Sequence, residues 1–158
     1  MKTLLKITFL AIAILNFNCK ESTKQVAEEV VTELEQAVPV SSTEQSKSVI
    51  DHHIRAFLAN DLEAVVLDYT EESVVITPDT MVVGLEGVKS LFAGLFKAFP
   101  SESTTIETDK VVIENELVYL IWHGKSSVVE VPFGTDTFII ENDKIQRQTF
   151  SGIINPIE

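Results

Sequence analysis

Three stretches of the chain repeat hydrophobic residues at the three- and four-residue spacing of an amphipathic helix. The pattern predicts helices at residues 44–59, from Leu62 to about Tyr69, and at 85–99. Asn60 and Asp61 separate the first two stretches, and a short polar side chain at that point favours a helix end followed by a new N-cap. In the first predicted helix His53 lies within the apolar stripe, whereas His52 lies outside it.

A second periodicity, of two residues, predicts a sheet. Two short apolar runs, 74–76 and 81–83, are separated by a Thr-Pro-Asp-Thr sequence that is typical of a tight turn. The alternation then continues through four longer runs, separated by turns rich in Asn, Asp, Gly and Ser: residues 104–113, 117–124, 128–140 and 144–153. Helices followed by consecutive strands predict an α+β domain with its helices on one face of a mainly antiparallel sheet.

The N-terminal residues have the pattern of an export signal. Lys2 and Lys6 precede an apolar run from Ile7 to Leu15, which is shorter than the roughly 20 residues that span a bilayer. Cys19 comes directly after residues 1–18, and this arrangement resembles a bacterial lipoprotein signal in which those residues are removed and Cys19 is acylated. The resemblance implies a membrane-anchored, exported lipoprotein on the periplasmic or cell-surface side. The alternative is a signal whose cysteine carries no lipid.

Composition separates a tether from one folded domain. Residues 19–42 are rich in Glu, Gln, Ser and Thr, which indicates a flexible or partly helical tether, and residues 43–158 are expected to form the domain. The formal charge of -12 offers no basic surface and argues against a nucleic-acid partner. The single cysteine excludes an intramolecular disulfide, and no pair of histidines one helical turn apart indicates a metal site.

Three segments in this order resemble the nuclear transport factor 2-like superfamily, to which SnoaL-like polyketide cyclases and ketosteroid isomerase belong. They are Asn60-Asp61-Leu62-Glu63-Ala64, Tyr69-Thr70-Glu71-Glu72-Ser73-Val74 and Gly84-Leu85-Glu86-Gly87-Val88. The resemblance implies a cone-shaped fold in which about three N-terminal helices pack in a strongly curved sheet. It also implies a small-molecule pocket open at one end and a homodimer formed through the outer sheet face. No cofactor is expected.

The isomerase members of that superfamily use a carboxylate base and two donors to an enolate oxygen. By the resemblance, Thr77 occupies the position of the base, and a threonine hydroxyl cannot serve as a base near neutral pH. Ile54 lies near the position of the tyrosine donor, while Asp136 matches the protonated aspartate. Steroid isomerisation is therefore disfavoured. A different acid–base pair, His53 and Asp136 facing one another across the cavity, stays open, as does the alternative that His53 is an ordinary core residue.

Strand register determines which aromatic side chains face the pocket, because neighbouring residues of a strand point to opposite faces. The register implied by the family directs Trp122 inward and His123 outward with Tyr119 and Ile121. That outer set is apolar enough to form a dimer interface. Candidate pocket residues are Tyr69, Val118, Leu120, Trp122, Phe138, Gln148 and Phe150.

Two functions follow from this sequence, and a third remains open. The first, which we prefer, is an exported lipoprotein whose domain binds a small, largely apolar molecule. The second is a cofactor-independent enzyme of the cyclase, isomerase or dehydratase type that uses His53 and Asp136. The third is a dimerisation module whose pocket is closed by its own aromatic residues.

Overall fold

The computed structural model describes residues 42–158, and the predicted signal, Cys19 and nearly all of the predicted tether lie outside them. Three helices come early in this part of the chain: α2 (Ser42–Leu58), α3 (Leu62–Leu67) and α4 (Gly84–Ala98). The strands are β1 (Val74–Ile76), β2 (Met81–Val83), β3 (Thr105–Glu114), β4 (Leu117–Lys125), β5 (Val129–Glu141) and β6 (Lys144–Pro156). In the described residues no helix is long and apolar enough to span a membrane.

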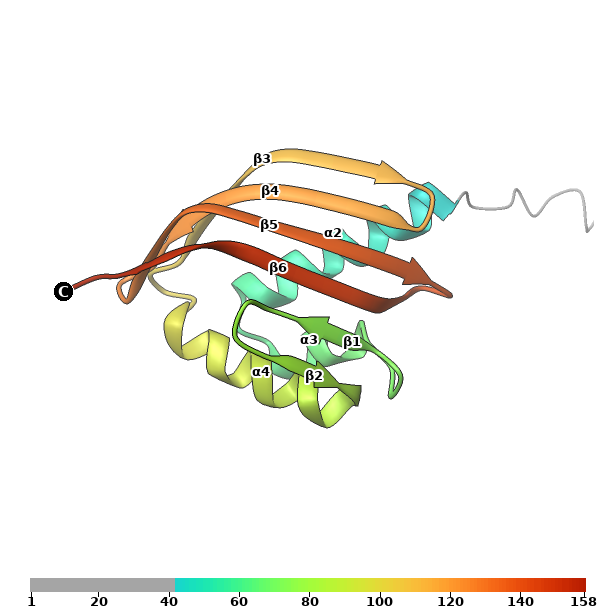
Figure 1. The fold of residues 1–158 in the computed structure, drawn as a ribbon, viewed down its shortest axis with the longest axis horizontal. Helices are drawn as coiled ribbons and strands as arrows, with labels where there is room; N and C mark the ends of the chain where they lie inside the picture. Colours follow the sequence, from blue (N-terminus) through green and yellow to red (C-terminus); the bar gives the residue numbers. More distant parts are fainter. Residues whose placement is uncertain (1–41) are drawn as a thin grey trace, which may run out of the picture. The chain divides into compact units, whose positions relative to one another are not determined.

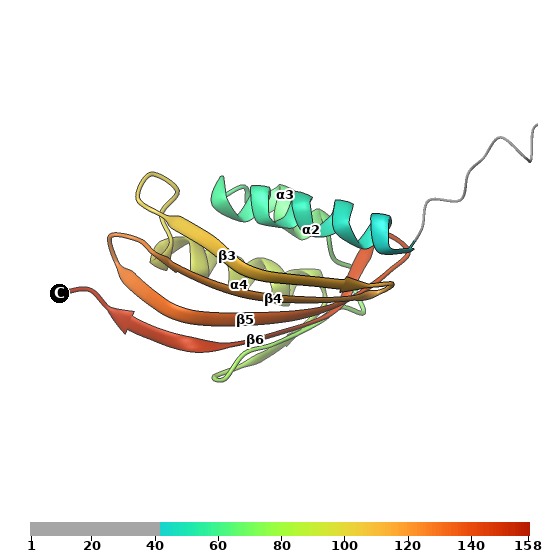
Figure 2. The same cartoon turned by 90° about the horizontal axis from the view of Figure 1, so that it is seen from above.

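The strands form one curved sheet in the order β2-β1-β6-β5-β4-β3. All neighbours are antiparallel except β1 and β6, which run parallel with Val75 opposite Gln148. The helices lie on the concave side of the sheet, as Figures 1 and 2 show from two directions. This arrangement confirms the predicted α+β cone, with one parallel strand pair that periodicity could not reveal.

Local chemistry explains where the elements begin and end. Asp61 caps α3 by accepting a hydrogen bond from the Ala64 backbone N–H at 3.0 Å, and Asn60 ends the preceding helical segment with a φ of 53°. The β5–β6 hairpin turns through Asn142 and Asp143, with φ of 53° and 59°, the conformation that a tight hairpin with right-handed twist requires. Short polar side chains thus produce the chain reversals that the sequence predicts.

The core forms where the apolar face of α4 meets the sheet. Val88 and Phe92 of α4 are buried against a cluster that also contains Val65, Val118, Phe138 and Ile145. Helix α4 starts at Gly84, so Gly87 belongs to its first turn. A Cβ on Gly87 would lie 3.0 Å from Val82 Cβ, and glycine therefore lets α4 pack closely on β2.

Candidate functional site

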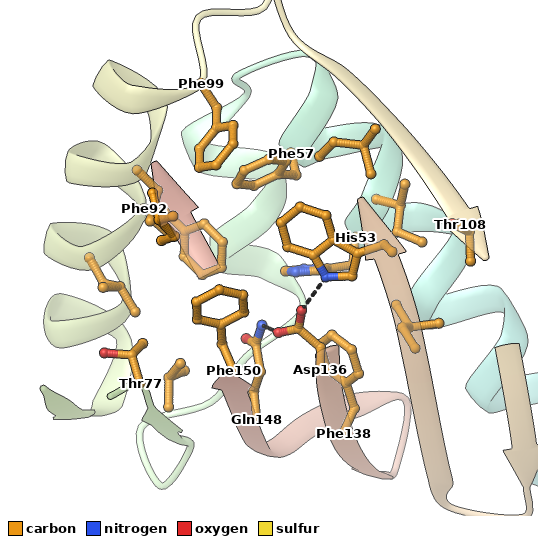
Figure 3. A pocket seen from close by; sticks show the side chains of 18 residues that line it. His53, Phe57, Thr77, Phe92, Phe99, Thr108, Asp136, Phe138, Gln148 and Phe150 are labelled. Atoms are coloured by element: carbon orange, nitrogen blue, oxygen red, sulfur yellow. Dashed lines mark hydrogen bonds between the residues drawn. The ribbon is translucent and has the colours of Figure 1, made fainter. Parts of the chain in front are cut away.

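A cavity of about 130 Å³ lies between the helices and the concave face of the sheet. Its walls are mostly apolar and aromatic, with His53, Asp136, Gln148, Thr77 and Thr108 as the polar groups. Figure 3 shows His53 and Phe57 entering from α2, Phe92 and Phe99 from the α4 side, and Asp136 and Gln148 from the sheet. The cavity therefore joins an apolar chamber to a small polar cluster on its sheet side.

Asp136 is the centre of the polar cluster. Its Oδ2 accepts a hydrogen bond from Trp122 Nε1 at 2.8 Å, and its Oδ1 accepts one from Gln148 Nε2 at 2.9 Å (Figure 3). The hydroxyl of Tyr69 in turn donates to Gln148 Oε1. The donors form a chain that ends on the carboxylate, so both oxygens of Asp136 have partners before any ligand enters.

Burial sets the acid–base behaviour of this cluster. Desolvation raises the pKa of the Asp136 carboxyl, and the hydrogen bonds from Gln148 and Trp122 and the charge of His53 offset only part of that effect. Burial, together with the charges of Asp136 and Asp68, also raises the pKa of the Tyr69 hydroxyl well above its ordinary value. Tyr69 therefore stays a neutral donor, and Asp136 takes up a proton more readily than an exposed aspartate does.

His53 lies on the helix side of the same cavity. Its ring packs edge-on against Tyr69, Phe92 and Phe138, with centroid separations of 5.5 to 5.7 Å. Its Nδ1 lies 3.3 Å from Oδ2 of the buried Asp68, the residue that ends α3. Within residues 42–158 no hydrogen bond joins His53 to Asp136, although both line the cavity.

Most of the sequence-predicted site residues meet at this cavity. The cavity is lined by seven of them: His53, Asp136, Leu120, Trp122, Phe138, Gln148 and Phe150. Tyr69 and Val118 are buried at 3% and 0% exposure and do not line it, although Tyr69 contacts the cluster through Gln148. His123 points to the other face of β4, where its Nδ1 meets Asp109 Oδ2 at 3.0 Å on the neighbouring strand.

Sequence reasoning missed two kinds of site residue. Several wall residues, among them Phe57, Leu91, Leu95 and Phe99, lie in apolar stripes that indicate only buried helix faces. Asp68 was also missed, since a single carboxylate between Leu67 and Tyr69 follows no recognisable pattern. Within residues 42–158, no group of three or more His, Cys, Asp or Glu side chains is arranged to hold a metal ion.

Comparison with solved structures identifies the class of fold. A nuclear transport factor 2-like protein of unknown function from Burkholderia xenovorans matches with a TM-score of 0.59 at 16% identity, over 73% of this chain and 87% of its own. A putative ketosteroid isomerase from Kribbella flavida matches with a TM-score of 0.60 at 10% identity, over 75% and 84%. SalBIII, described as an epoxide hydrolase/cyclase-like enzyme in pyran ring formation in the polyether salinomycin, matches at 0.61 and 15% identity, over 72% and 97%.

At these identities the structural matches establish the fold alone. The sequence is more specific: residues 50–148 match the model of the SnoaL-like domain family. The chain therefore belongs to the SnoaL-like domain family, and its fold is that of nuclear transport factor 2-like proteins, as its sequence indicated. No curated protein matches the sequence.

Proposed function

We propose that this domain binds a small, largely apolar molecule that carries one polar oxygen. The observation behind this proposal is the cavity itself, a mostly apolar chamber with a hydrogen-bonded polar cluster around Asp136. Pockets for small molecules combine mostly apolar walls with a few polar groups that fix orientation. The cavity volume of about 130 Å³ approaches the ~150 Å³ of a buried apolar cavity that holds benzene. The ligand would thus place one ring inside and direct any larger substituent to the mouth.

Ile154 and Ile153 offer a matched test of this site. Ile154 lines the cavity and is 47% exposed, whereas Ile153, its neighbour on β6, is 55% exposed and does not line it. We expect Ile154→Trp to narrow the mouth and weaken binding, and Ile153→Trp to leave binding unchanged. Equal binding by wild type and both variants would contradict the proposal.

The probes for this test are 1-phenylethanol, ethylbenzene and benzoate, and binding is measured by saturation-transfer NMR on the probe's own signals. The alcohol combines one ring with one hydroxyl, which can donate to the Asp136 carboxylate, and should bind best. Ethylbenzene has the ring without the oxygen, and benzoate brings a charge that an apolar wall and the Asp136 carboxylate disfavour. Preferential binding of benzoate would contradict the proposed ligand class.

A second candidate function is a cofactor-independent acid–base enzyme of the cyclase, isomerase or dehydratase type. It is supported by the pairing of His53 with Asp68, because an imidazole whose Nδ1 is held by a carboxylate keeps Nε2 for proton transfer. Burial shifts the pKa of Asp136 upward and makes it a candidate acid on the same cavity. If His53→Ala and Asp136→Asn each abolish turnover of an identified ligand while affinity is kept, the binding-only function is wrong.

We further propose that the domain is exported and anchored through acylated Cys19, and that it forms a homodimer through the outer sheet face. The pattern of Lys2, Lys6, the apolar run and Cys19 supports the anchor. Metabolic labelling with a palmitate analogue tests it, with Cys19→Ser as the variant that should lose both the label and the membrane fraction. A labelled Cys19→Ser protein, or unlabelled wild type, would contradict acylation at this residue.

A further inference from the structure

Two adjacent histidines of α2 meet the same buried carboxylate. His52 Nδ1 lies 2.6 Å from Asp68 Oδ1, and His53 Nδ1 lies 3.3 Å from Asp68 Oδ2. The two imidazoles occupy different surroundings, since the side chain of His52 is 42% exposed and that of His53 is 7% exposed. Only His53 lines the cavity, so Asp68 connects a cavity group to a surface group.

Asp68 is held in place from two directions. It ends α3, where its backbone N–H donates to the carbonyls of Val65 and Val66. Its own carbonyl accepts a hydrogen bond from the Ile145 N–H of β6 at 2.8 Å. These bonds fix the backbone of Asp68 to both a helix and the sheet. Its side chain is 8% exposed.

The hydrogen-bond chemistry of the three groups determines where their protons sit. An ionised carboxylate only accepts hydrogen bonds, whereas a neutral imidazole carries one N–H and one bare nitrogen. Each histidine therefore presents Nδ1–H to Asp68, and in a neutral ring this leaves Nε2 without a proton. For His53 this places a proton acceptor at the cavity wall.

We propose that Asp68 is the positioning residue that fixes His53 in the Nδ1–H tautomer, and that His52 covers the solvent-side oxygen of the same carboxylate. The bond to His53 is the longer of the two, so it depends strongly on how the carboxylate is oriented. The shorter bond from His52 supplies that orientation and restricts water at Oδ1. The inference deepens the acid–base role proposed above for His53, but its test requires no ligand.

The experiment is ¹⁵N NMR of the histidine side chains in the whole chain at neutral pH. The protein has three histidines, so single substitutions assign every signal. We expect the wild-type spectrum to show His53 and His52 with protonated Nδ1 and unprotonated Nε2. Asp68→Asn should move His53 toward the Nε2–H tautomer. His52→Ala should preserve the His53 tautomer and make its Nδ1 proton exchange with water several-fold faster.

His123 provides the matched control, because its Nδ1 also meets a carboxylate, Asp109, on the outer face of the sheet. Asp109→Asn should change the His123 signals and leave those of His53 unchanged. An Nε2–H tautomer of His53 in the wild type would overturn the proposal even if Asp68→Asn fails to fold. An unchanged tautomer in folded Asp68→Asn, or unchanged proton exchange in His52→Ala, would overturn it equally. Since none of these signals depends on a bound molecule, failure of 1-phenylethanol to bind would count against the proposed function alone.

Discussion

The indole of Trp122 lies directly against the backbone of Gly134 on the neighbouring strand. The two residues are paired across β4 and β5, and a Cβ on Gly134 would lie 2.7 Å from Cε2 of the indole. Gly152 of β6 is paired with Gly134, and a Cβ on Gly152 would lie 2.9 Å from Cζ of the Phe150 ring. Two glycines thus leave room for two aromatic walls of the cavity, whose ring centroids are 6.0 Å apart.

Gly134→Ala should displace the Trp122 ring, because the added methyl group needs the space that the indole occupies. The displacement would break the bond from Nε1 to Asp136, and we expect a loss of about 1 to 3 kcal/mol in the free energy of unfolding. Trp122 is the only tryptophan of the chain, so its fluorescence emission reports the move directly.

Gly94→Ala is the matched control for this change. Gly94 lies within α4, and a Cβ there would meet nothing within 4 Å. Alanine is favoured over glycine inside a helix by about 1 kcal/mol, so this variant should be more stable than wild type with unchanged emission. A Gly134→Ala protein that also keeps its stability and emission would contradict the close packing described here.

The chain from Tyr69 through Gln148 to Asp136 predicts coupled mutations. Tyr69→Phe removes the donor to Gln148 Oε1 and should cost about 1 to 3 kcal/mol, as a buried polar atom loses its partner. Gln148→Leu removes partners from both Tyr69 and Asp136 and should cost more. In a double-mutant cycle by urea unfolding, the two should depart from additivity by about 0.5 to 3 kcal/mol.

Tyr119→Phe deletes the same hydroxyl from the outer face of β4, where it is not part of this network, and serves as the control. It should change the free energy of unfolding little. Additive effects of Tyr69→Phe and Gln148→Leu would show that the chain of hydrogen bonds is not continuous in solution.

The sequence predicted the elements of this fold well and their tertiary chemistry less completely. The limits of helices and strands follow from local periodicity and from capping residues such as Asp61, whose hydrogen bonds reach only a few residues along the chain. The parallel pairing of β1 with β6 joins Val75 to Gln148 across more than half of the domain, and no local pattern encodes it.

The site shows the same division. Alternation along β4 places Trp122 and His123 on opposite faces, and the family resemblance correctly predicted that Trp122 faces the cavity. Whether Phe57 or Leu95 packs tightly or borders a cavity depends on the volume left between elements, which is a property of the whole packed domain. Asp68 could not be predicted as a site residue for a similar reason, because its role depends on contacts with two histidines of another helix.

The raised pKa of Asp136 predicts a pH-dependent stability difference between the wild type and Asp136→Asn. Burial places the folded-state pKa above the unfolded value of about 3.9, so the unfolded chain releases this proton first as the pH rises. As the pH rises from the unfolded-state pKa to the folded-state pKa, the wild type therefore loses stability. The asparagine variant lacks this loss because its side chain does not titrate. Asparagine also leaves one donor, from Trp122 or Gln148, without an acceptor, a cost that does not depend on pH.

The measurement is urea unfolding of both proteins from about pH 3 to pH 8, in which the contributions of shared carboxylates cancel. The stability of Asp136→Asn relative to wild type should improve as the pH rises through this window. Asp79→Asn, in the exposed turn between β1 and β2, is the control and should show no such trend. A relative stability of Asp136→Asn that falls with rising pH would mean that Asp136 is stabilised in its ionised form.

The outer face of β4 provides the last prediction, on self-association. Tyr119 and Ile121 alternate with the inward residues of β4, and the partly exposed Val112 lies opposite Tyr119 on β3. An apolar strip of this kind on a sheet face suits burial against a second copy. Ile121→Glu should therefore convert the proposed dimer to a monomer in sedimentation equilibrium, because it places a charge in the strip that the second copy would bury. Ser90→Glu adds the same charge to an exposed position of α4 and should leave the dimer intact. A monomeric wild type, or a dimer that tolerates Ile121→Glu, would exclude this face as the interface.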